Sequence, residues 1–244
     1  MYDYRNILID FFKSNEVFYN SKTIDKIISF LEEVFQFNLS VNIVGTKSKD
    51  EIFIRHIMDS LSIFSLKNYF SYNDLVNKKI LDFGSGAGFP GILFSIILED
   101  SKIFLLEKNQ KKANFLIGLS KKLELNNTEI LNFSAENLVK KSTFREKFDY
   151  SVARAVSNIF ILLELIIPFA KIGGKIFLYK SKKVFNEILE TKELINRLGA
   201  EVESVNELKV PLLEEFRVIE VLKKITKTPK KYPRDLSIIK KTIA

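Results

Sequence analysis

The chain contains no cysteine and only one histidine, His56. Without cysteine it can form no disulfide, no cysteine-ligated zinc site, no iron–sulfur cluster and no thiolate nucleophile. A single histidine likewise rules out a histidine-rich metal site. The composition therefore excludes thiol chemistry, and we expect no metal.

The chain also lacks long hydrophobic runs. No stretch of about 18 uninterrupted apolar residues occurs, and residues 1–6 do not combine a basic start with a hydrophobic run. The 244 residues, of which 46% are hydrophobic, can bury the core of one large domain or of a domain with an extension. We therefore expect a soluble, unexported, cytoplasmic protein that does not bind membranes.

Positive charge is concentrated near the C-terminus. The formal net charge is +8, and residues 223–244 contain eight basic residues against one acid, Asp235. Residues 1–222 are nearly neutral, with 30 basic and 29 acidic side chains. A basic tail suits a phosphate backbone, because each lysine or arginine contact releases condensed counterions. A solvated tail that aids solubility would show the same charge run, so both interpretations stay open.

The most informative segment is residues 80–91. An apolar run ends in Asp82, passes into a loop with alternate glycines, and continues through Pro90 into a second apolar run. This pattern predicts a strand, a tight turn and a helix. Glycine tolerates positive φ and has no Cβ, so a ligand can lie against the bare backbone. Pro90 suits a first helical turn, whose free N–H groups bind polar or anionic groups. We expect a nucleotide-like cofactor here.

The glycines fit two cofactor motifs. The dinucleotide pattern G-x-G-x-x-G is satisfied by Gly86, Gly88 and Gly91. The pattern D-x-G-x-G-x-G, which is similar to the first motif of S-adenosylmethionine-dependent methyltransferases, is satisfied from Asp82 to Gly88. Glu107 follows the next predicted strand and serves either motif as an acceptor for ribose hydroxyls. Glycines kept only for packing are a third possibility, although a turn alone requires fewer of them.

The chain divides into three predicted regions. Residues 1–75 show helical periodicity, with one apolar face on the helix that contains Ile24, Ile27 and Leu31. Residues 76–225 alternate short apolar runs with amphipathic segments, which is typical of βαβ units around a mainly parallel sheet. We expect strands near 79–83, 102–107, 128–132, 148–153, 174–180, 202–208 and 216–223, with helices near 91–99, 109–124, 155–171 and 183–198. The last two strands are separated by too few residues for a helix, so they should form an antiparallel hairpin. Residues 226–244 are predicted to be a basic, flexible tail.

Candidate site residues follow the strands, because ligands of open α/β sheets bind beyond the carboxyl ends of the strands. Besides the glycine loop and Glu107 they are Ala135 and Glu136, Arg154, and residues 180–183. Glu136 could instead only favour a helix N-terminus. Arg154 can pair bidentately with a ligand carboxylate or phosphate, or be a surface charge.

The residues that the chain lacks limit which kinds of atom could accept a methyl group. Methylation of cytosine C5 needs a cysteine nucleophile, and the usual Asn/Asp-Pro-Pro-aromatic motif for exocyclic amines is replaced by Ala153-Arg154-Ala155-Val156. An acceptor with an exposed lone pair, such as guanine N7, loses no proton and needs no general base. We therefore expect no catalytic acid or base.

With these residues, the chain resembles the bacterial 16S ribosomal RNA guanine-N7 methyltransferases, the glucose-inhibited division protein B family. The resemblance covers nearly the whole length and rests on four motifs: residues 55–61, 82–91, 148–155 and 228–234. It implies a Rossmann-like S-adenosylmethionine-dependent methyltransferase fold with a helical N-terminal extension, S-adenosylmethionine as cofactor and a guanosine of small-subunit RNA as acceptor. The cofactor-binding positions that it implies are Gly84, Phe89, Ala135, Glu136 and Arg154, with Glu107 and the adjoining glycine-loop residue Gly86 completing the set.

The family's usual Gly- and Pro-containing ending is absent after Arg234, so the role of the last ten residues stays open. We expect Arg55, Lys230, Lys231 and Arg234 to neutralise RNA phosphates, and His56 to pack rather than bind. The leading hypothesis is a monomeric 16S rRNA guanine-N7 methyltransferase. The alternatives are an NAD-dependent oxidoreductase and a non-catalytic RNA-binding protein with a methyltransferase-like fold.

Overall fold

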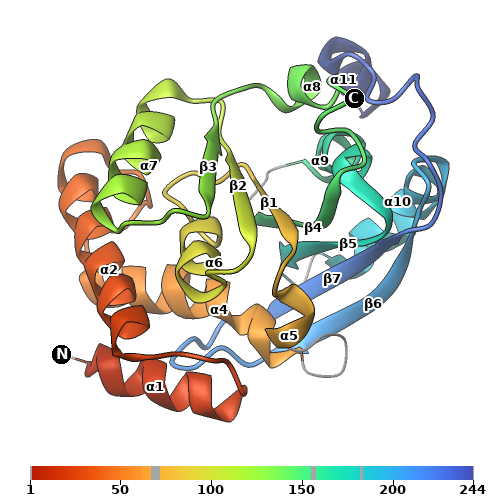
Figure 1. The fold of residues 1–244 in the computed structure, drawn as a ribbon. Coiled ribbons are helices and arrows are strands. Elements are labelled where there is room, and N and C mark those ends of the chain that lie inside the picture. The colour runs from red at the N-terminus through yellow and green to blue at the C-terminus, as the bar shows by residue number, and fades with distance from the viewer. Residues whose placement is uncertain (1, 67–71, 155–157, 182–183, 244) are drawn as a thin grey trace.

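A computed structural model describes residues 2–66, 72–154, 158–181 and 184–243. Seven strands form one sheet in the order β3-β2-β1-β4-β5-β7-β6 (Figure 1). The strands are β1 Lys79–Phe83, β2 Lys102–Leu106, β3 Thr128–Leu131, β4 Phe148–Arg154, β5 Ala170–Lys180, β6 Ala200–Leu208 and β7 Arg217–Lys224. Strands β1 to β5 are parallel, whereas β7 runs antiparallel to both β5 and β6. The expected sheet with a closing hairpin is confirmed.

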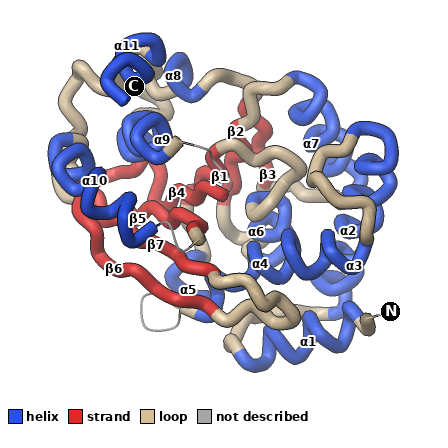
Figure 2. Tube along the Cα trace, turned by 180° about the vertical axis from the view of Figure 1, so that it is seen from behind, coloured by secondary structure: helices blue, strands red, loops and turns tan. Residues whose placement is uncertain are grey.

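Helices cover both faces of the sheet (Figures 1 and 2). Before β1 lie α1 Tyr4–Ser14, α2 Ser21–Val41, α3 Lys49–Ile52, a π-helical turn Phe53–Met58, α4 Asp59–Leu61, a 3-10 turn Ser62–Ser65 and α5 Tyr72–Leu75. Between and after the strands lie α6 Gly91–Ile97, α7 Gln110–Lys122, α8 Ala135–Leu138, α9 Ile159–Ile166 with a 3-10 turn Ile167–Phe169, α10 Val184–Arg197 and α11 Leu236–Ile243.

The N-terminal helices share a hydrophobic core with one face of the sheet. Ile24, Ile27 and Leu31 of α2 are buried, as their spacing predicts, and they belong to the same apolar cluster as Phe94 of α6 and Val152 of β4. A second cluster on the opposite face joins α8, α9 and α10 to the sheet. The helical extension is thus packed into the main body rather than separated from it.

Two details differ from the sequence prediction. β5 begins at Ala170, before the glycine pair, and the pairing with β4 shifts between Phe148 and Tyr150. A Cβ on Gly174 would lie 2.7 Å from the backbone oxygen of Asp149, so Gly173 and Gly174 lie inside the strand, at an irregularity in its pairing. The predicted helix 155–171 is observed as α9 and its 3-10 turn. Its first residues, 155–157, lie outside the described part of the chain, and so do residues 67–71 and 182–183, which belong to other predicted segments.

The C-terminal residues also differ from the predicted flexible tail. Thr228, Tyr232 and Ile239 are buried, and α11 lies beside α8 and α9 at the edge of the molecule (Figures 1 and 2). Charge alone indicated a solvated segment, because the buried residues of this region are sparse and separated by lysines. The tail is therefore part of the folded body up to α11.

Candidate active site

The glycine loop leaves β1 and turns back over the end of β2. Gly84, Gly86 and Gly88 have φ angles of +75°, +58° and +101°, a region that L side chains rarely adopt. The backbone N–H groups of Gly84 and Ser85 both donate to the carbonyl oxygen of Leu106, at 2.9 and 3.1 Å. Within the loop Gly84 is exposed and Gly86 is half-buried, so this part of the backbone is accessible to a ligand at the carboxyl edge of the sheet.

Asp82 joins this loop to the following helix. Its Oδ2 accepts from the backbone N–H of Gly91 at 2.9 Å, and a Cβ on Gly91 would come within 2.5 Å of the same oxygen. Burial of the carboxyl raises its pKa to about 7, against the opposing effect of the Gly91 hydrogen bond. Both residues hold the start of α6 against β1.

Glu107 lies directly opposite the loop. Its Oε2 accepts from Gly86 N at 3.0 Å and its Oε1 accepts from Asn109 N at 2.7 Å. A carboxylate oxygen can accept more than one hydrogen bond, so each oxygen keeps capacity for a ligand hydroxyl. The two backbone donors fix the orientation of the carboxylate before any ligand binds.

A cavity of about 360 Å³ opens at this carboxylate, and we call it the Glu107 cavity. Four predicted site residues line it: Gly84, Glu107, Ala135 and Glu136. Its volume falls in the range of small-molecule sites, roughly 300–1,000 Å³. It combines the fixed carboxylate of Glu107 with a mostly apolar lining that also includes Lys108, Glu136 and Lys240, which suits a nucleoside with ribose hydroxyls and a flat base.

A second cavity of about 360 Å³, the Arg154 cavity, lies next to the first. Phe83, which lines the Glu107 cavity, pairs in the sheet with Ala153, which lines the Arg154 cavity. Adjoining α9 residues, Ile161 and Leu162, line one cavity each. The two cavities therefore flank the carboxyl ends of β1 and β4 and could hold two ends of one ligand, or a ligand and a substrate.

Asp59 organises the charges of the Arg154 cavity. Its buried carboxylate accepts from Arg154 Nε at 2.9 Å and from Arg217 Nε at 3.1 Å. A buried carboxylate requires such compensation, since an unpaired buried charge is costly. The same Arg154 also donates to the backbone oxygen of Arg55 at 2.6 Å and lies 2.8 Å from His56 Nδ1. Arg154 is thus rigidly placed at the cavity wall.

Phe89 lines neither cavity, although the guanidinium carbon of Arg154 lies 5.8 Å from the centre of its ring. Its ring is buried, stacks on the His56 ring with centroids 5.2 Å apart, and packs against Phe30 of α2. Burial, with the nearby Arg154 cation, lowers the pKa of His56 to about 3, so the imidazole is neutral near pH 7. Phe89 links the glycine loop to the N-terminal helices, and the packing expected for His56 agrees with its position.

Comparison with known proteins identifies the family. A family model described as "GidB: rRNA small subunit methyltransferase G" matches residues 23–215. The Ribosomal RNA small subunit methyltransferase G of Oenococcus oeni is 36% identical over 216 residues, covering 88% of this chain and 86% of its own. The protein of that name from Fusobacterium nucleatum is 34% identical over 233 residues, covering 94% and 97%. The chain belongs to the rRNA small subunit methyltransferase G family. This membership confirms the resemblance, the enzyme class and S-adenosylmethionine as cofactor, and it removes the NAD-dependent alternative.

The fold agrees with this family assignment. The branched-chain polyamine synthase of Thermus thermophilus, solved with N4-aminopropylspermidine and 5′-methylthioadenosine, superimposes with a TM-score of 0.53 at 11% identity. The match covers 70% of this chain and 57% of that one, and it shows a common fold only. Within the described ranges, no helix of this family member has the length and apolar content needed to cross a bilayer.

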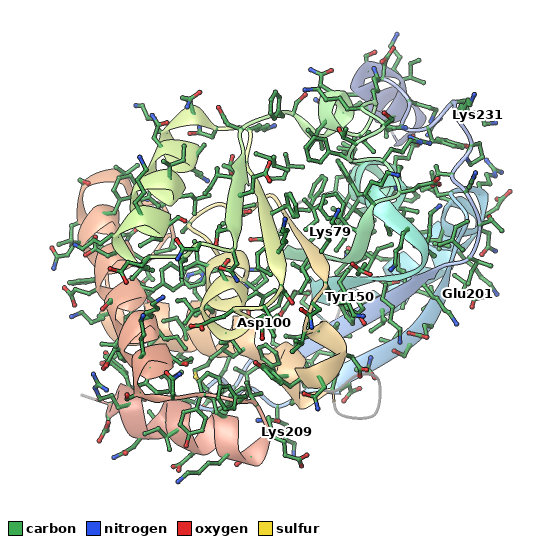
Figure 3. All side chains as sticks on the ribbon, viewed as in Figure 1. Lys79, Asp100, Tyr150, Glu201, Lys209 and Lys231 are labelled. Carbon is green, nitrogen blue, oxygen red and sulfur yellow. The ribbon has the colours of Figure 1, made fainter. Side chains whose placement is uncertain are left out.

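The predicted RNA-binding residues lie in different settings. Lys230 and Lys231 are exposed, and Lys231 lies at the outer edge of the molecule (Figure 3). Arg55 is half exposed and pairs with Glu215 at 2.5 Å. The guanidinium of Arg234 pairs with Glu164, a fully buried acid of α9, and the Arg234 side chain is 30% exposed. Of the four, Arg55, Lys230 and Lys231 are exposed, and Arg234 is partly buried.

Two residues of the site were not predicted. Asp59 appeared only as part of a motif, and Arg217 was not singled out. A signal for Asp59 is present in the sequence, because this acid stands among Ile57, Met58 and Leu61 on an apolar helix face and therefore needs a cation. Its partners lie 95 and 158 residues away, so the sequence does not identify them. The predicted Lys180 also lines the Arg154 cavity, paired with Glu187 at 2.7 Å.

Proposed function

We propose that this family member transfers the methyl group of S-adenosylmethionine to N7 of one guanosine in small-subunit ribosomal RNA. The observation that supports this most directly is the pair of adjoining cavities at the carboxyl ends of β1 and β4. One presents the fixed carboxylate of Glu107 and the other the guanidinium of Arg154. A nucleoside donor and a base acceptor can therefore meet between them.

The residues present fit the donor. Gly84, Glu107, Ala135 and Glu136 form a cavity of small-molecule size, with carboxylate oxygens available for the ribose hydroxyls. Gly86 holds that carboxylate through its N–H group. We propose that Arg154 pairs with the carboxylate at the amino-acid end of the donor, since its Nη1 has only a 3.5 Å contact with Ser60 Oγ. Phe89 contributes indirectly, by packing the loop against His56.

The Arg154 cavity is suited to an acceptor that needs no general base. When bound, S-adenosylmethionine supplies a methyl group on a positively charged sulfur, and guanine N7 receives it on a lone pair without losing a proton. The charged side chains that line the described cavity are already paired, Asp59 with two arginines and Lys180 with Glu187. Burial and the neighbouring Asp59 raise the pKa of Tyr179 well above its usual value, so its hydroxyl stays protonated. The chain therefore contributes orientation and exclusion of water rather than proton transfer.

We further propose that Lys230, Lys231 and Arg55 contact RNA phosphates, whereas Arg234 stabilises the fold. We expect the protein to act as a monomer in the cytoplasm, where its RNA substrate is assembled into ribosomal particles. The regions 1–75, 76–225 and 226–244 are proposed as functional divisions of one folded unit. These regions supply packing, chemistry and RNA contacts, respectively.

The test is to incubate the protein and labelled S-adenosylmethionine with 16S rRNA and with small-subunit particles from a strain that lacks the gene. We expect label on one guanosine, mapped to N7. A matched pair of variants, Glu107→Gln in the cavity and Glu129→Gln at an exposed position of β3, is measured by equilibrium dialysis with the donor. Glu107→Gln should weaken binding about tenfold or more, through loss of charge-assisted hydrogen bonds, and Glu129→Gln should not.

Donor binding without methyl transfer to either substrate would favour a non-catalytic RNA-binding protein. Label on an atom other than N7 would contradict the proposed acceptor. Equal donor affinity in the Glu107→Gln variant and the unaltered protein would overturn the assignment of the Glu107 cavity.

A further inference from the structure

Residues 225–235, which we call the C-terminal segment, cross from the end of β7 back over the molecule. Just before it, at the end of β7, Lys224 is fully buried and donates to the backbone oxygens of Leu198 and Thr226 at 2.9 and 2.6 Å. Further along, the guanidinium of Arg145 donates to the backbone oxygens of Thr228 and Tyr232, each at 3.0 Å. One buried donor, Lys224, and one partly buried donor, Arg145, thus hold the backbone of this segment.

The segment ends at an ion pair with α9. Glu164 is 0% exposed, and its carboxylate accepts from Arg234 Nε at 2.9 Å and from the Arg234 backbone N–H at 3.1 Å. Both groups belong to the residue two positions before α11. The pair therefore fixes where α11 begins, beside α9 and close to α8, as Figures 1 and 2 show from opposite sides.

α11 presents two different faces. Ile239 is 0% exposed and anchors the helix, whereas Ile238 is 50% exposed and Lys241 points to the surface. Leu236 and Lys240 are one turn apart, so they share a face. Both line the Glu107 cavity. The helix thus forms part of the lining of the cavity that Gly84 of the glycine loop also lines.

We propose that α11 forms the wall of the donor site that contacts the adenine ring. Leu236 lies in the wall with Phe133, Ile161 and Leu165, an apolar set that suits the face of a flat base. Lys240 adds a hydrogen-bond donor, and adenine has acceptor nitrogens at its edge. The family match ends at residue 215, so α11 lies outside the segment that it covers. This inference rests on the proposed placement of the donor in the Glu107 cavity.

The test compares three ligands that share the adenosine part: S-adenosylmethionine, S-adenosylhomocysteine and 5′-methylthioadenosine, which lacks the amino-acid end. Their dissociation constants are measured by calorimetry for the full chain with Leu236→Ser and with the matched control Ile238→Ser. Leu236→Ser should weaken all three by a similar factor, roughly 5- to 30-fold, from the apolar contact it loses. Ile238→Ser should change none of them more than about twofold, as expected of an exposed side chain.

A second matched pair covers the case in which Leu236→Ser disturbs folding, which is monitored by its urea midpoint. Lys240→Ala should weaken the binding of the three ligands roughly 2- to 10-fold, as expected for one hydrogen bond to an uncharged acceptor. Lys241→Ala should not change it. Weakening of S-adenosylmethionine and S-adenosylhomocysteine without 5′-methylthioadenosine would overturn the adenine contact. Unchanged binding in both Leu236→Ser and Lys240→Ala, while Glu107→Gln still weakens donor binding, would overturn it too. Unchanged binding in Glu107→Gln as well would instead overturn the placement of the donor itself.

Discussion

Replacement of Arg234 by alanine separates a structural role from an RNA contact. The substitution leaves the Glu164 carboxylate, which is 0% exposed, without its cation. Breaking a buried ion pair in this way costs about 3–5 kcal/mol. Because the Arg234 side chain is 30% exposed and its backbone N–H still donates to Glu164, we expect the lower end, about 3 kcal/mol. For a chain of this size that lowers the unfolding temperature by roughly 6–12 °C.

The assay is urea unfolding of the Arg234→Ala variant, together with the salt dependence of its RNA affinity. The free energy of unfolding should fall, while the salt slope should stay unchanged. The matched control is Lys231→Ala, which should leave stability unchanged and reduce the slope by about 0.7–0.9, the value for one phosphate contact. Removing both partners, as Arg234→Met with Glu164→Leu, should restore much of the stability. An Arg234→Ala variant of full stability with a reduced salt slope would refute the reasoning.

Three further predictions concern the site. Burial and Arg154 lower the pKa of His56 to about 3, so between pH 6.5 and 3 only the unfolded chain binds the proton, and stability falls as the pH falls. In urea titrations the unaltered protein should lose up to about 2 kcal/mol more than His56→Gln between pH 7 and 5. Parallel curves of unfolding free energy against pH for the two proteins would contradict this. Gly88→Ala should destabilise the fold by about 2–4 kcal/mol, since φ is +101° and the added Cβ would lie 2.6 Å from Ile92 Cγ1. The control Gly45→Ala, with φ +74° and open space around the added Cβ, should cost only about 1–2 kcal/mol. Equal losses of stability in thermal unfolding would refute the steric argument. Asp59→Asn should lower the free energy of unfolding by about 3 kcal/mol, because two arginines lose their shared carboxylate, and a neutral effect on the urea midpoint would show that these cations are solvated.

The parts of the fold that the sequence predicts well depend on neighbours in the chain. The alternation of apolar runs and amphipathic segments predicts all the strands of the sheet within a few residues, and the short connection before Arg217 predicts the antiparallel hairpin. The same holds for the glycine loop, where Gly84 and Gly86 adopt positive φ, and for Glu107 at the end of β2. Each of these features follows from spacing or from a residue type with a specific backbone preference.

The features that the sequence does not predict depend on contacts between distant parts of the chain, which hydrophobic periodicity does not encode. Phe89 follows the glycine loop in the chain, but its ring turns to Phe30 and His56, because the N-terminal helices pack on that face of the sheet. The three sequence regions likewise share their cores, since an amphipathic helix is stabilised by whichever apolar face it meets. Where that face lies is a property of the assembled sheet.

The buried acids show most directly what can and cannot be predicted from the sequence. Asp59 and Glu164 each stand in an apolar helical stretch, and a carboxylate in such a place must have a cation or a hydrogen-bond donor near it. The sequence thus predicts that partners exist. It does not identify them, because the chain has 38 lysines and arginines, and those that pair here lie 95, 158 and 70 residues away. The excess of positive charge that favours RNA binding therefore also conceals which cations are structural, and for Arg234 the measurements on Arg234→Ala separate the two roles.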